Sequence, residues 1–122
     1  MTLHYLDFDY SEDAEGAGSF DAMASTTPQQ AAAVQAEVAR VLGWAHAAFP
    51  QSRGPVEEGG EWDYELRGTR ETTAGESWEF DAHSARLTVL PGATATVRHT
   101  VHLVIGGSAA FCAALRERFG LE

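Results

Sequence analysis

The sequence of 122 residues has one cysteine, one isoleucine, no lysine and no asparagine. A single cysteine, Cys112, cannot form an intramolecular disulfide, which is typical of a reducing compartment. No apolar run approaches the roughly 18 residues of a membrane-spanning helix, and Met1–His4 lacks the basic and apolar regions of a signal peptide. We therefore expect a cytoplasmic protein. The scarcity of residues with A/T-rich codons, beside 21 alanines, indicates a GC-rich bacterial source.

Positive charge is also scarce. The chain has 8 Arg and Lys against 18 Asp and Glu, which gives a net charge of -10. Proteins that bind nucleic acid or acidic lipid surfaces need clustered basic residues, and no such cluster exists here. The first 25 residues contain no base, and their acids are Asp7, Asp9, Glu12, Asp13, Glu15 and Asp21. We therefore expect neither nucleic acid nor a membrane as a partner.

The length favours a single domain with one hydrophobic core, since 44% of the residues are hydrophobic. We assign residues 1–120 to this domain. The last two residues, Leu121 and Glu122, follow a natural helix stop at Gly120 and resemble the remnant of a C-terminal affinity tag.

Alternating apolar residues predict an N-terminal hairpin with strands over about 3–10 and 18–25. A helix over 28–49 follows, with Thr27 as its cap and Pro28 in its first turn. Its apolar residues recur every three or four positions and form one face. Polar residues, Glu37 among them, fall mostly on the other face.

The second half predicts a loop over 50–60 and then four strand segments. The apolar positions of the segments are Trp62, Tyr64 and Leu66 in the first, Trp78 and Phe80 in the second, Leu87 and Val89 in the third, and alternate residues from Ala95 to Ile105 in the fourth. A soft connection over 68–75 separates the first two segments, and a Pro91-Gly92 turn separates the last two. A short helix, capped by Ser108, ends at Gly120.

The element order is therefore β-β-α-β-β-β-β-α. Strands joined by short turns pair antiparallel, and two amphipathic helices bury their apolar stripes most economically against one sheet face. The expected fold is an α+β two-layer sandwich, with an antiparallel sheet of five or six strands and both helices on one face.

Two patterns raise the question of a metal. Asp7 and Asp9 supply hard oxygen ligands on one strand face, with Asp21 opposite, but neither register fits an EF-hand loop. A solvated hairpin is the favoured interpretation, and the two acids stay weak metal candidates. His99 and His102 point to opposite faces of a strand, so we expect His99 in the core and no zinc site. We expect no cofactor.

Two further patterns favour ordinary structure. The Gly106-Gly107-Ser108 junction resembles a nucleophile elbow, but no histidine follows Ser108, so an ordinary helix cap is the better interpretation. The alternating aromatic residues favour packing in the core, namely Trp62, Tyr64, Trp78 and Phe80.

The sheet face away from the helices is the candidate ligand or partner face. Its leading residues are Asp7, Asp9, Asp21, Arg67, Arg98 and His102. The first hypothesis is a small non-enzymatic domain that acts through a protein partner or through self-association. The alternative is a small-ligand-binding protein or a hydrolase that depends on a divalent cation, uses the acids of this face and has His102 as its base. No catalytic residue is assigned.

Overall fold

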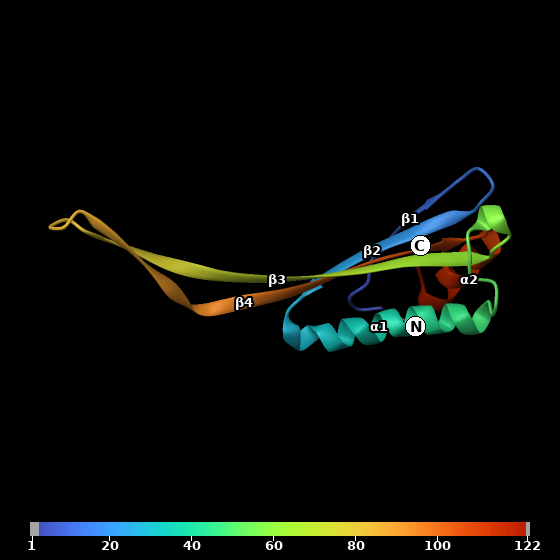
Figure 1. Ribbon diagram of the computed structural model, residues 1–122. Helices are drawn as coiled ribbons and strands as arrows, with labels where there is room; N and C mark the ends of the chain where they lie inside the picture. Colours follow the sequence, from blue (N-terminus) through green and yellow to red (C-terminus); the bar gives the residue numbers. More distant parts are fainter. Residues whose placement is uncertain (1–2, 122) are drawn as a thin grey trace.

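The computed structural model describes residues 3–121, except for the side chains of residues 93 and 94. Two helices lie on one face of a curved antiparallel sheet, and one end of that sheet continues far beyond them (Figure 1). The elements are β1 (Phe8–Glu12), β2 (Gly18–Thr26), α1 (Pro28–Ala48), a short 3-10 helix η1 (Val56–Glu58), β3 (Trp62–Asp81), β4 (Arg86–Gly107) and α2 (Ala109–Phe119). The α+β class, the antiparallel pairing and both helices are confirmed.

The four strand segments predicted in the second half are all extended, but they join into two long strands. The sheet is therefore four strands wide, in the order β1-β2-β4-β3. A register shift between Ala74 and Glu76 separates the predicted segments of β3. Pro91 and Gly92, which were predicted to form a turn, lie inside β4 at this irregularity. The strand continues through them because a bulge tolerates a proline, which has no N–H to donate to the ladder.

The folded body has its core between the sheet and the helices. Trp62 is fully buried, stacks on Phe111 with 5.6 Å between ring centroids, and donates its indole N–H to the Phe49 carbonyl at 3.2 Å. The other fully buried large side chains come from β2, β4 and both helices: Phe20, Leu103, Ile105, Leu115, Val41 and Cys112. Burial of this apolar surface supplies most of the stability of the body.

The helix boundaries agree with the sequence. Ser108 caps α2 by accepting the Phe111 backbone N–H at 3.2 Å, and Gly120 ends the helix in the left-handed region at φ 65°. Leu121 donates its N–H to the Arg116 carbonyl and packs against the core, so the folded unit extends to this residue. Glu122, the other residue assigned to a tag, lies outside the described residues.

The N-terminal strand begins later than expected, and Glu37 explains the difference. This residue is 3% exposed, although the helical pattern placed it on the polar face. Its carboxylate accepts the backbone N–H groups of His4, Tyr5 and Leu6 at 2.6 to 3.1 Å. Because these donors point to α1, the segment before Phe8 lies on the helix and does not join the sheet.

The sheet changes character beyond the helices. β2 pairs with β4 only as far as Thr26 and His99. From Glu71 and Arg98 outward, the described residues of β3 and β4 pair only with each other, and they form a long two-stranded projection (Figure 1). We call residues 71–98 the arm.

We expect Glu37→Ala to lower the free energy of unfolding by about 2–3 kcal/mol. A hydrogen bond to a charged acceptor contributes about 1.5–3 kcal/mol, and the buried Leu6 N–H loses this bond, whereas the more exposed N–H groups of His4 and Tyr5 bind water instead. Urea denaturation measures this change. Glu117→Ala, at an exposed position on α2, is the matched control and changes the free energy by less than about 0.5 kcal/mol. Equal losses in the two variants would contradict a structural role for Glu37.

Candidate functional site

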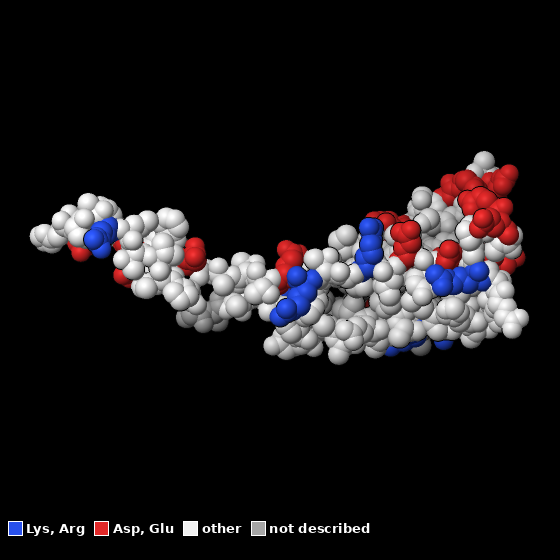
Figure 2. Space-filling model, viewed as in Figure 1, with Lys and Arg blue, Asp and Glu red and all other residues white. Residues whose placement is uncertain are grey.

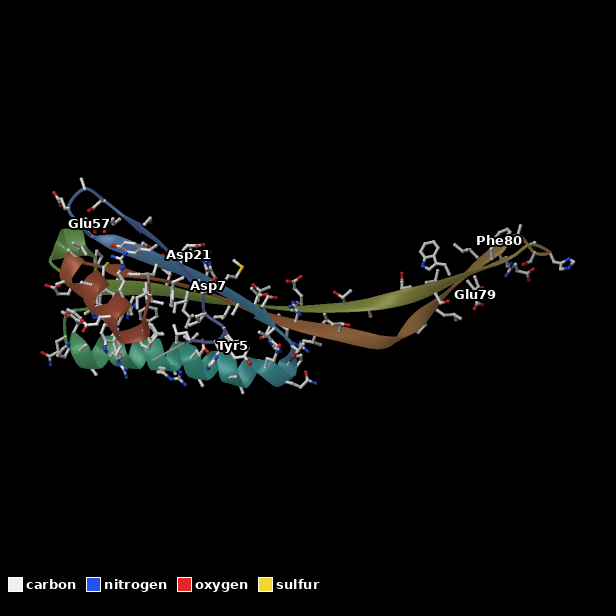
Figure 3. The ribbon with its side chains drawn as sticks, turned by 180° about the vertical axis from the view of Figure 1, so that it is seen from behind. Tyr5, Asp7, Asp21, Glu57, Glu79 and Phe80 are labelled. Carbon is white, nitrogen blue, oxygen red and sulfur yellow. The ribbon has the colours of Figure 1, made fainter. Side chains whose placement is uncertain are left out.

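The end of the arm presents an apolar cluster. Trp78 is paired with Val89 and Phe80 with Leu87, and directly opposed residues in an antiparallel ladder share one face. The exposed fractions of these residues are 63%, 44%, 65% and 52%. Figure 3 shows Phe80 and its neighbour Glu79 on opposite sides of the arm. We call Trp78, Phe80, Leu87 and Val89 the apolar tip.

The apolar tip overturns the expectation that Trp78 and Phe80 pack in the core. Their alternation is that of a half-buried strand, but the helices reach only the other end of the sheet (Figure 1). Of the other two residues in the predicted row, Trp62 lies in the core and Tyr64 is partly buried against it. The observed strand length separates the two pairs, since helices of 21 and 11 residues cannot cover strands of 20 and 22 residues.

The sheet face away from the helices brings three of the predicted site residues together. The Asp21 carboxylate lies 2.8 Å from Nε2 of His102, and the Arg67 guanidinium lies 3.4 Å from Nδ1. Because arginine only donates, Nδ1 accepts and the proton of a neutral ring lies on Nε2, directed at Asp21. The exposure along this row is uneven, because 53% of the Asp21 side chain but only 23% of the His102 side chain is accessible.

Of the other predicted residues, Asp9 lies beside this row, as the strand partner of Asp21. Arg98 donates to the Ser25 hydroxyl at 2.7 Å and to the Ser25 carbonyl at 3.1 Å, across the sheet and toward the arm. Asp7 precedes β1. Among the described residues, no group of three or more His, Cys, Asp or Glu side chains could hold a metal ion.

An open trough of about 590 Å³ lies beside the β1–β2 turn, where acidic side chains gather (Figure 2). Its acidic residues are Glu12, Asp13, Glu57, Asp63 and Glu65. The Tyr64 backbone N–H, donated to Asp63 at 2.9 Å, lowers the pKa of that carboxyl, and Arg53 at 2.8 Å lowers it further against the opposing effect of burial. A lowered pKa makes Asp63 a poor general acid at neutral pH.

A second pocket, of about 300 Å³, lies at the root of the arm, where the sheet leaves the cover of α1. Ala24, Val34 and Val101 give it an apolar lining, and Arg70 and His99 also line it. His99 was expected in the core, but it is only partly buried because the helical layer ends here. We call this cavity the root pocket.

Comparison with protein-family models, with curated proteins and with solved structures finds no match for this chain. Within residues 3–121, neither helix combines the length and the apolar character that crossing a membrane requires.

We expect Arg53→Gln to raise the pKa of Asp63 part of the way to its ordinary value, because the Tyr64 N–H remains. Carboxyl-detected NMR titration measures the shift, with Arg40→Gln on α1 as the control. The stability that Asp63 contributes is present at neutral pH and is lost as the pH falls through its lowered pKa. An unchanged titration in Arg53→Gln would contradict this assignment.

Proposed function

We propose that the protein is a non-enzymatic interaction module and that the arm is its binding element. One observation carries the proposal: a two-stranded ribbon, which is only marginally stable alone in water, extends from the body with four large apolar side chains exposed at its end. An exposed cluster of apolar side chains with charged residues around it is typical of an interaction site. Two aromatic residues at its centre supply the type of side chain that dominates binding energy.

The hydrolase or ligand-binding alternative has weaker support. This alternative requires carboxyl groups in a cleft whose pKa values suit proton transfer. The pKa of Asp63 is lowered, which keeps this carboxyl ionised at neutral pH. The acidic trough is open, and the row of Asp21, His102 and Arg67 lies on an exposed face. We therefore rank association above catalysis.

The proposal includes the compartment and the kind of partner. The lone thiol, Cys112, is buried, which agrees with a reducing bacterial cytoplasm. The net charge of -10 favours a protein partner over nucleic acid.

Photo-crosslinking tests the arm directly. We expect benzoylphenylalanine at position 80 to form a discrete adduct in cells of the source organism, because the partner covers the apolar tip. The same group at position 117, on the exposed face of α2, is the control and should give no such adduct. Identical adduct patterns from both positions, or none from position 80, would contradict the proposed function.

We also expect the double variant Trp78→Ser, Phe80→Ser to abolish the adduct when the photoreactive group is moved to position 87. Each aromatic anchor contributes about 2 kcal/mol or more to binding. The variant should keep the free energy of unfolding within about 1 kcal/mol of the wild type, since both side chains are exposed. Leu90→Ser, which removes an exposed apolar side chain from the opposite face of the arm, is the matched control and keeps the adduct.

A further inference from the structure

The root pocket and the apolar tip have complementary surfaces. The pocket is a recess between α1, β2, β3 and β4 whose apolar lining is supplied by Ala24, Ala31, Val34 and Val101, with polar residues such as Arg70 and His99 beside it, and the apolar tip is a protruding cluster of large side chains. Within one chain they lie at opposite ends of the arm. That separation is about 35 Å, because the arm has eleven residues of β3 at about 3.3 Å each. The tip of a chain therefore cannot fill its own root pocket.

The charges at the two ends of the arm are also opposite. The end that carries the apolar tip has three acids, Glu76, Glu79 and Asp81, and one base, Arg86. The root has two bases, Arg70 and Arg98, and one acid, Glu71. Figure 2 shows acidic and basic side chains at both ends. An antiparallel pair of arms sets each acidic end against a basic root, whereas a parallel pair sets like charges together.

The chain exposes more surface than a compact monomer of its mass. The chain exposes 8079 Å², whereas a compact monomer of 13.1 kDa exposes about 6,400 Å². The excess of about 1,700 Å² exceeds the roughly 800 Å² that each partner contributes to a stable interface. The arm accounts for this excess, because nearly all of its described side chains are exposed.

We propose that the occupant of the root pocket is the apolar tip of a second copy of this chain. Two arms lie antiparallel about a two-fold axis, so that each tip packs into the root pocket of the other chain. The arrangement is isologous, and it closes after two copies. It rests on the proposed function of the arm and names the partner. Neither contact site is complete in a single chain.

Two variants, one changed at the tip and one in the pocket, isolate the two halves of this contact. The tip variant is Trp78→Ser, Phe80→Ser. The pocket variant is Ala31→Glu, which places a carboxylate in the recess that receives an acidic tip; its position near the start of α1 suits an acidic residue. The matched control is Ala32→Glu, at the next position of α1, which is exposed and outside the pocket.

Sedimentation equilibrium on the full chain tests the dimer. We expect a wild-type dimer whose dissociation constant rises at least tenfold in the tip variant and in the pocket variant, and stays unchanged in Ala32→Glu. Native mass spectrometry of the two weakened variants mixed together then gives the decisive result. A heterodimer has one intact tip-to-pocket contact and either homodimer has none, so the heterodimer should exceed both homodimers.

Three results would overturn the proposal: a wild-type monomer at the highest concentration the sample permits, a dimer that both variants leave intact, and a mixture without excess heterodimer. These results are distinct from failure of the arm as a binding element. If position 80 crosslinks to a different protein while the wild type is monomeric, the proposed function stands and the second copy is excluded. If position 80 gives no adduct, both fail.

Discussion

The structure depends on the continuity of β4. Over 22 residues this strand runs from the arm into the middle of the sheet, where β2 and β3 flank it and both helices cover it. The same backbone therefore belongs to two environments, one buried between layers and one open to water on both faces. Since the hydrogen-bond ladder with β3 continues through both with one irregularity, the orientation of the arm is set by the core around Leu103 and Ile105.

The body holds this strand without help from the arm. Trp62, at the first residue of β3, stacks between helix and sheet residues, and its indole N–H is satisfied by a loop carbonyl. The carboxylate of Glu37 binds the N-terminal segment to α1 through three consecutive backbone donors, an arrangement that resembles an anion nest. Neither set of contacts involves a residue of the arm, so the apolar tip is not required by the core.

The sequence predicts the helices and strands well, but it does not predict which parts of the sheet the helices cover. Proline and serine at the helix starts, glycine at the last helix end and alternation in the strands define the boundaries, because these signals act over a few residues. Alternation at Trp78 and Phe80 cannot reveal whether a helix covers them, since coverage depends on where α1 ends in space. The role of Glu37 is hidden for a similar reason: its partners are backbone groups about thirty residues away. Of the candidate site, the row of Asp21, His102 and Arg67 follows from strand pairing, whereas the root pocket depends on the length of α1.

In the arm, the described residues of β3 and β4 pair only with each other. The length of the arm can therefore change without loss of contacts in the body. Removing two residues from each strand shortens the ribbon by about 7 Å and returns every remaining side chain to its original face, whereas removing one from each reverses the faces. The irregularity between Ala74 and Glu76 keeps the strand segments on either side of it in separate registers. The distance between the apolar tip and the body can therefore change during evolution in steps of two residues per strand, with the apolar face unchanged.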